Sequence, residues 1–153
     1  MVRVNQLRVL PGRDRREKLD YILEDQPGFL LRLALRRHTT IFTESMIDLT
    51  PPQFSVVVKL LEIGPTSQNY LGRLVSFDQA TIKGIVDRLS DRGLVEVCPD
   101  PSDKRRRAVV LTDKGQKLTE KSIKMAKEIT DRTVEPLTRA EQQEFVRLLK
   151  KLI

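Results

Sequence analysis

The sequence feature that most constrains the fold is a pair of short helices joined by a very tight connection. Ser67 is a typical N-cap of the first helix, and Asp78, which follows the connection Val75-Ser76-Phe77, is a typical N-cap of the second. Gly93 ends the second helix, because glycine readily adopts the left-handed conformation that closes helices. Residues 67–94 therefore predict a helix-turn-helix rather than one continuous helix.

Two short runs rich in β-branched residues follow the second helix. Leu94 to Cys98 and Ala108 to Leu111 predict two strands of a β-hairpin. The loop between them carries four cations: Lys104, Arg105, Arg106 and Arg107. Asp103 is placed to orient Arg105 through a charge-assisted hydrogen bond. The hairpin therefore presents a basic tip, for which the alternative interpretation is a loop that is charged only to stay soluble.

Longer amphipathic segments lie on both sides of this region. Apolar residues spaced by three and four predict a helix from Pro27 to about Ile47. Thr112 and Thr138 are N-caps of two further helices, the first of which ends near Arg132. In so short a chain the apolar sides of these helices have no other obvious partner, so we expect them to be buried against a second copy.

Another helix is predicted directly before the helix-turn-helix. Thr50, Pro51 and Gln53 form a capping signal at its start, and Gly64-Pro65 ends it. We expect its inward stripe to consist of four apolar residues: Phe54, Val57, Val58 and Leu61.

Together these elements predict a mainly α fold. It is a winged helix-turn-helix whose amino- and carboxy-terminal helices form a dimerisation region. The amino-terminal segment is basic and interrupted at Pro11-Gly12, and a short helix is expected around Leu19 to Leu23. The expected organisation is a basic arm with a short helix (1–26), dimerisation helices (27–48 and 113–153) and a DNA-binding winged helix-turn-helix lobe (49–112).

The charge of the chain favours polyanionic partners, and its composition argues against catalysis. A formal net charge of +7 favours nucleic acid, because neutralising phosphates releases counterions. One histidine and one cysteine supply neither a metal-ligand cluster nor a nucleophile with its base, so we expect no enzyme, metal site or cofactor. Cys98 cannot form an internal disulfide, and no apolar run approaches the ~18 residues of a membrane span. We expect a cytoplasmic protein.

The second short helix carries polar side chains beside its apolar stripe, as a DNA recognition helix does. Glutamine pairs with adenine edges, lysine reaches guanine or phosphate, threonine contacts phosphate or a thymine methyl, and aspartate accepts from cytosine. For an isolated polar stripe a solvated helix face is the alternative, but the basic hairpin that follows favours DNA. The predicted DNA-binding residues are Ser67, Asp78, Gln79, Thr81, Lys83, Arg88, Asp103, Lys104, Arg105 and Arg106.

Several short motifs along this region resemble the MarR family of bacterial regulators. They are Asp87-Arg88-Leu89, Arg92-Gly93-Leu94-Val95, Asp103-x-Arg105, Leu111-Thr112 and Gly115. The resemblance covers the chain from about Pro27 and implies a triangular homodimer with two lobes on a pseudo-palindromic operator in double-stranded DNA. It also implies that Arg105 enters the minor groove. Members of the family commonly repress transcription, and a small ligand changes the spacing of the lobes.

Two segments resemble members that control aromatic-acid catabolism. They are Gln26 to Arg32 and Phe77 to Ile82, whereas Ala34-Leu35-Arg36 departs from the Ala-His-Gln often found in such relatives. The resemblance implies an aromatic carboxylate or its CoA thioester as effector, for which arginines would supply anion partners. The candidate ligand-binding residues are Arg32, Arg36, His38 and Phe42. Surface or interface pairing is the alternative for the arginines, and packing is the alternative for the histidine.

A non-specific architectural DNA-binding protein is the remaining alternative. Such a protein derives its affinity from phosphate contacts alone. Its binding also weakens as salt rises, so salt dependence does not separate the two functions. A large preference for one operator over random duplex does separate them.

Overall fold

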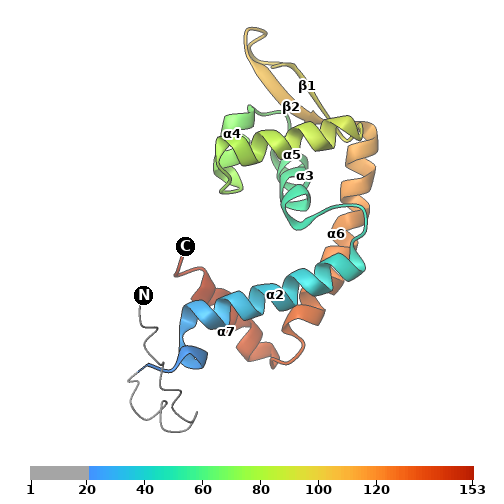
Figure 1. Ribbon diagram of the computed structural model, residues 1–153. Helices are drawn as coiled ribbons and strands as arrows, with labels where there is room; N and C mark the ends of the chain where they lie inside the picture. Colours follow the sequence, from blue (N-terminus) through green and yellow to red (C-terminus); the bar gives the residue numbers. More distant parts are fainter. Residues whose placement is uncertain (1–20) are drawn as a thin grey trace, which may run out of the picture. The chain divides into compact units, whose positions relative to one another are not determined.

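The computed structural model describes residues 21–153, which belong to two compact units, residues 1–37 and 38–153. The described elements are η1 (Leu23–Asp25), α2 (Pro27–Ser45), α3 (Pro51–Ile63), α4 (Gln68–Leu74), α5 (Gln79–Asp91), β1 (Val95–Pro99), β2 (Arg107–Leu111), α6 (Asp113–Val134) and α7 (Arg139–Leu149) (Figure 1). The predicted order of helices and hairpin is therefore confirmed. Within residues 21–153 no helix combines the length and the apolar character that crossing a membrane requires.

The described part of the first unit contains the 3-10 turn η1 and the first half of α2. The short helix expected around Leu19 to Leu23 begins outside the described residues, and residues 21 and 22 are not helical, so that expectation was wrong there. Ile22 is extended (φ −100°, ψ 112°), so the 3-10 turn begins only at Leu23. Pro27 disfavours a helical conformation of the preceding Gln26, which is also extended (φ −81°, ψ 131°) and separates this turn from α2. The basic arm lies outside the described residues up to position 20.

The second unit holds the hydrophobic core, to which α3 contributes its most buried face. Val56, Val57 and Leu60 are 0–2% exposed. Of the predicted stripe, Val57 is fully buried and Phe54 is half-buried against the core, whereas Val58 and Leu61 are half-buried and do not belong to it. The predicted inward stripe is therefore confirmed at Val57 and Phe54 and was wrong at Val58 and Leu61. The helix is apolar on several sides and packs against α4, α5, α6 and β2 together, so its apolar spacing alone does not identify the buried face.

The predicted helix starts are confirmed by side-chain capping bonds. The side chains of Thr50, Ser67, Asp78, Thr112 and Thr138 each accept a hydrogen bond from the backbone N–H three residues later. Gly64 (φ 75°) and Gly93 (φ 67°) supply the positive φ angles expected at helix ends. The N–H of Leu94 donates to the carbonyl of Leu89 at 2.9 Å, which is the bond of a Schellman ending.

The two strands form an antiparallel hairpin whose base is fixed to the helix-turn-helix. Val95 pairs with Leu111 and Pro99 with Arg107, so the strands fall within one residue of the predicted bounds. Val109 also pairs with Thr66, just before α4, through hydrogen bonds of 2.7 and 3.2 Å. The tip of the hairpin projects away from the helices (Figure 1). The base of the hairpin is therefore fixed to the helices, whereas the loop at its tip extends away from them.

The connection between α4 and α5 contains a left-handed residue, Ser76 (φ 56°). A residue with a side chain is destabilised by about 1–2 kcal/mol in the left-handed region of backbone conformation. Glycine avoids this strain but loses more conformational entropy on folding. We expect Ser76→Gly to raise the free energy of unfolding by up to about 1 kcal/mol in a urea titration, because the strain exceeds the added entropy. Ser76→Val, with its β-branched side chain, should lower it. A destabilised glycine variant would contradict the role of φ at this position.

Candidate nucleic-acid interface

Helix α5 is held by its apolar side, which fixes the direction of its polar side. Ile82, Ile85, Val86 and Leu89 are at most 2% exposed and belong to the core of the second unit. At about 100° per residue, side chains away from this stripe must face outward. The four predicted DNA-binding residues that lie on α5 are exposed as expected: Gln79, Thr81, Lys83 and Arg88.

An ion pair joins two outward residues one helical turn apart. Lys83 Nζ lies 2.5 Å from Asp87 Oδ2, and the side chains are 64% and 55% exposed. So exposed a pair contributes little to stability, typically below about 1 kcal/mol, because water screens it. Lys83 can therefore exchange this partner for a base or a phosphate at small cost.

Ser67 and Asp78, which we predicted to contact DNA, act in the free chain as N-caps. The Ser67 hydroxyl accepts from the N–H of Tyr70 at 3.3 Å, and Asp78 Oδ1 accepts from the N–H of Thr81 at 2.7 Å. The backbone N–H and then the side chain of Thr81 hold the pKa of Asp78 below its ordinary value. Asp78 therefore stays ionised at neutral pH. An ionised carboxylate only accepts hydrogen bonds, so it can receive one from a base amino group but repels phosphate.

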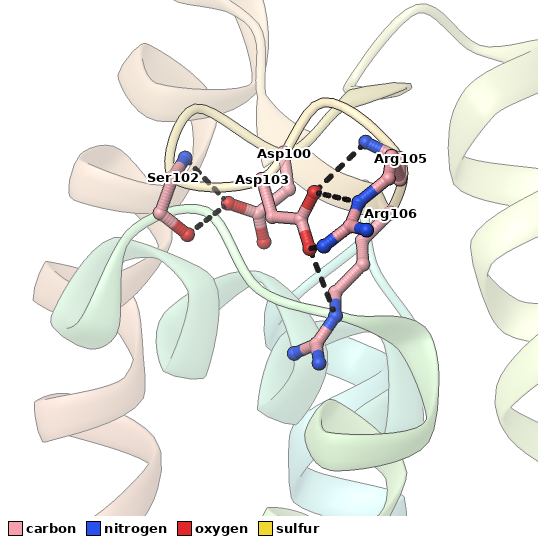
Figure 2. A network of polar contacts seen from close by, with 5 residues as sticks. All are labelled: Asp100, Ser102, Asp103, Arg105 and Arg106. Carbon is pink, nitrogen blue, oxygen red and sulfur yellow. Dashed lines mark hydrogen bonds and ion pairs between the residues drawn. The ribbon is translucent and has the colours of Figure 1, made fainter.

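The hairpin tip is organised around the carboxylate of Asp103 (Figure 2). Its Oδ1 accepts from the N–H and Nε of Arg105, both at 3.1 Å, and its Oδ2 accepts from Arg105 Nη2 at 3.3 Å. Arg106 Nε lies 3.5 Å from the same Oδ2. The predicted contact between Asp103 and Arg105 is therefore confirmed, with a two-oxygen fork that fixes the guanidinium plane. The Arg105 side chain nevertheless remains 90% exposed.

A second carboxylate, which the sequence reasoning missed, shapes the other side of the same loop. Asp100 Oδ1 accepts from the N–H of Ser102 at 2.8 Å and from its hydroxyl at 2.6 Å (Figure 2). The hydroxyl and then the N–H of Ser102 lower the pKa of Asp100. The N–H of Asp100 donates in turn to the carbonyl of Arg106 at 2.9 Å. The spacing Asp-Pro-Ser, typical of an Asx turn, could have indicated this contact.

Other basic residues near the helix-turn-helix were also missed as interface candidates. The Arg73 guanidinium lies over the Tyr70 ring, 5.5 Å from its centroid, and both residues lie on α4, the helix that in this motif crosses the DNA backbone. Arg107, counted among the cations of the tip, donates from Nη2 to the carbonyl of Val97 at 2.6 Å and so braces the hairpin. The i, i+3 spacing of Tyr70 and Arg73 on a capped helix was the available signal.

The contact between Asp103 and Arg105 can be tested through the pKa of Asp103. The Arg105 side chain and then its N–H lower that pKa from its ordinary value. A lowered pKa means that the contact between Asp103 and Arg105 is fully formed above the ordinary carboxyl pKa. It is lost only when the pH falls through the lowered value, so the structure of the tip should persist in mild acid. We expect Arg105→Ala to raise the pKa of Asp103 in a carboxyl-carbon NMR titration. An unchanged pKa in this variant would contradict the side-chain contact.

The lobe is joined to α6 by a set of close contacts at Arg92, Gly93, Leu94, Thr112 and Gly115, which we call the α5–α6 joint. Thr112 donates from its hydroxyl to the carbonyl of Gly93 at 2.7 Å and from its N–H to that of Leu94 at 3.1 Å. Lys114 Nζ donates to the carbonyl of Arg92 at 2.7 Å. A Cβ built on Gly115 would lie 1.9 Å from the carbonyl oxygen of Leu94. The start of α6 therefore cannot move independently of the end of α5.

The predicted ligand-binding residues all lie on α2 but belong to different units. In the first unit, the Arg32 guanidinium lies 5.0 Å from the Phe29 ring centroid, and Arg36 also has an interaction partner. In the second, His38 is half-buried with Nδ1 3.0 Å from the Thr133 hydroxyl, and Phe42 is 4% exposed with its ring edge toward Phe54. Because the Thr133 hydroxyl donates to the carbonyl of Ile129, His38 Nδ1 is the donor to Thr133. Their role in ligand binding stays a prediction.

No group of three or more histidine, cysteine, aspartate or glutamate residues that could hold a metal occurs within residues 21–153. Cys98, near the end of β1, is half-buried.

Comparisons with known proteins point to the same kind of regulator. A family model described as the MarR family matches residues 49–106. The chain is 41% identical over 135 residues to the HTH-type transcriptional repressor NicR of Pseudomonas putida, with 87% of this chain and 85% of the relative covered. It is similar to the solved structure of a probable transcriptional regulator from Pseudomonas aeruginosa (TM-score 0.83, 43% identity, 86% of this chain and 100% of the other). It is also similar to Bordetella bronchiseptica BpsR, whose structure addresses regulation of DNA binding by 6-hydroxynicotinic acid (TM-score 0.82, 37% identity, 88% and 97% covered).

Proposed function

The chain belongs to the MarR family, and from this premise we propose that it binds a pseudo-palindromic operator as a homodimer and is released by a small aromatic acid or its CoA thioester. At the coarser level it is a transcriptional repressor of MarR type, a DNA-binding regulator rather than an enzyme. The observation that carries the proposal is the exposed Arg105 held by Asp103, in one unit with the exposed polar side of α5.

In the proposed complex the outward side chains of α5 read the major groove. Gln79, Thr81 and Lys83 lie in its first half, the part of a recognition helix that contacts base edges. Arg105 at the hairpin tip enters the minor groove, where negative potential is greatest when the groove is narrow. Lys104 and Arg106 bind the neighbouring phosphates. Ser67, still capping α4, donates its hydroxyl proton to a phosphate.

Exposed apolar side chains on α2 and at the carboxy-terminal end support a homodimer. On α2, Leu30, Leu31, Leu33 and Leu35 are 39–63% exposed. Val146 and Leu148 on α7 are 48% and 46% exposed, and Leu152 and Ile153, which follow α7, are 71% and 102% exposed. Apolar groups on this scale typically mark an interface. Two lobes related by a twofold axis then occupy half-sites about 34 Å apart on the duplex. We expect dilution to yield no well-folded monomer.

The effector proposal rests on the similarity to BpsR and on the α5–α6 joint. 6-Hydroxynicotinic acid, which the BpsR structure concerns, is a small aromatic carboxylic acid, and Arg32 or Arg36 would pair with such a carboxylate. Because the joint fixes the lobe to α6, a ligand that shifts α6 also shifts the lobe. A ligand that prefers the DNA-incompetent spacing by about 2.8 kcal/mol weakens operator affinity about 100-fold.

The test is selection of bound duplexes from a random pool, followed by release of the best duplex with a panel of aromatic acids and their CoA thioesters. We expect one palindromic sequence to be enriched, with a preference over random duplex of at least about 1,000-fold. Gln79→Ala and Lys83→Ala should change which bases are enriched. Absence of enrichment would favour the architectural alternative, and unchanged affinity with every acid and thioester would end the effector proposal.

A further inference from the structure

Helix α5 contains a glycine in its interior, Gly84. Glycine destabilises a helix interior relative to alanine, because its backbone loses more freedom on folding. A helix whose side chains must keep fixed positions should therefore contain glycine in its interior only where the absence of a side chain is required.

Other glycines in the described second unit have a reason within the fold. Gly64 and Gly93 have positive φ angles, which side chains rarely adopt. A Cβ on Gly72 would lie 3.1 Å from the carbonyl oxygen of Phe77, and one on Gly115 would lie 1.9 Å from that of Leu94. Either the backbone conformation or the packing thus excludes a side chain at these positions.

Neither reason applies to Gly84. Its φ lies outside the positive range. The nearest atoms that an added Cβ would meet are Nη1, Nη2 and Cζ of Arg88, at 3.5, 3.7 and 3.9 Å. These are ordinary van der Waals distances to the far end of a flexible side chain. The fold of the free chain therefore accepts alanine at this position.

The position of Gly84 on α5 suggests why a glycine is needed there. At about 100° per residue, Gly84 lies on the side of α5 opposite the buried Ile82, Ile85 and Val86. The same rotation places it between Asp87, which pairs with Lys83, and Arg88. Gly84 is therefore at the centre of the outward face, flanked by charged side chains that reach farther than it does.

We propose that Gly84 is a specificity-determining position of α5: its missing side chain lets the helix backbone lie against base edges in the major groove while Lys83 and Arg88 reach past it on either side. This inference rests on the proposed function. A Cβ at this point would stand between the helix axis and the bases. It would lift the helix and weaken the contacts of Gln79 and Thr81, which have to reach the same groove floor.

The experiment compares Gly84→Ala with Ser90→Ala, an exposed position near the end of the same helix that has no assigned DNA contact. Both substitutions favour the helix, so both should leave Tm unchanged or raise it by about 2–4 °C. Gly84→Ala should weaken binding to the duplex selected by the natural chain by about 10-fold or more, comparable with one mismatched base pair. When duplexes are selected from the random pool with Gly84→Ala, the base preference at the positions that face the middle of α5 should be lost. Ser90→Ala should keep affinity and preference.

The outcomes separate this inference from the proposed function. Selection with the natural chain tests only the proposed function, because it does not involve Gly84. If that chain selects an operator and Gly84→Ala binds it equally well with the same base preference, Gly84 has no role in specificity. A lower Tm for Gly84→Ala would also overturn the inference, because the glycine would then serve the fold. A larger residue, as in Gly84→Leu, should weaken binding further than alanine does.

Discussion

Arg105→Ala is expected to weaken operator binding by about 100-fold, the largest loss among substitutions in the hairpin. An arginine that reads a groove contributes about 1–3 kcal/mol, and the proposed homodimer would present two copies of Arg105. The Arg105 guanidinium is well suited to this role because it is 90% exposed yet held in a fixed plane by two oxygens of Asp103. Its conformational freedom is therefore restricted before DNA arrives, which lowers the entropy cost of binding. Titration of a fluorescent operator duplex at fixed salt measures the loss.

Two further variants distinguish the effect of the position of Arg105 from the effect of the net charge of the chain on DNA affinity. Lys127→Ala removes one exposed cation of α6 and should change affinity only slightly. Asp103→Asn removes a negative charge that would lie next to DNA in the proposed complex, and by Coulomb repulsion alone its removal would strengthen binding. If Asp103 holds Arg105, this variant should instead weaken binding, because the charged fork is lost. Stronger binding by Asp103→Asn would show that the ion pair competes with DNA rather than preparing Arg105 for it.

Gly115→Ala is expected to be the most destabilising glycine substitution in the described chain, lowering the free energy of unfolding by about 3 kcal/mol or more. The added Cβ would lie 1.9 Å from the carbonyl oxygen and 2.9 Å from the carbonyl carbon of Leu94, so backbone and not a flexible side chain must move. That movement would also disturb the hydrogen bond from the Thr112 N–H to the same carbonyl. Urea unfolding followed by circular dichroism measures the change.

Gly28→Ala is the matched control, because Gly28 lies in the first turn of α2 as Gly115 lies in the first turn of α6. A Cβ there would meet nothing within 4 Å. We expect this variant to be as stable as the natural chain or slightly more stable, because alanine favours a helix. Equal effects of the two substitutions would mean that helix propensity, and not the close approach at the α5–α6 joint, accounts for the result.

Much of the candidate interface was predictable because its local contacts are formed between residues close in the sequence. Asp78 caps α5 by a bond to a residue three positions away, and Asp103 reaches Arg105 over two. Such contacts depend on short spacings that the sequence displays directly. The Asx turn at Asp100 is equally local, because its carboxylate accepts from Ser102 only two residues later.

The amino-acid sequence by itself determined the capped starts of α3 to α7, the hairpin with its basic tip, and the membership motifs of a MarR regulator. Only the tertiary structure decided which face of α3 is buried and which glycines the fold requires. Gly115 and Gly84 are the same residue type in helices, yet one faces a carbonyl 1.9 Å from its Cβ position and the other faces outward. The physical reason is that capping acts through neighbours along the chain, whereas burial and close approach depend on segments that meet only after folding.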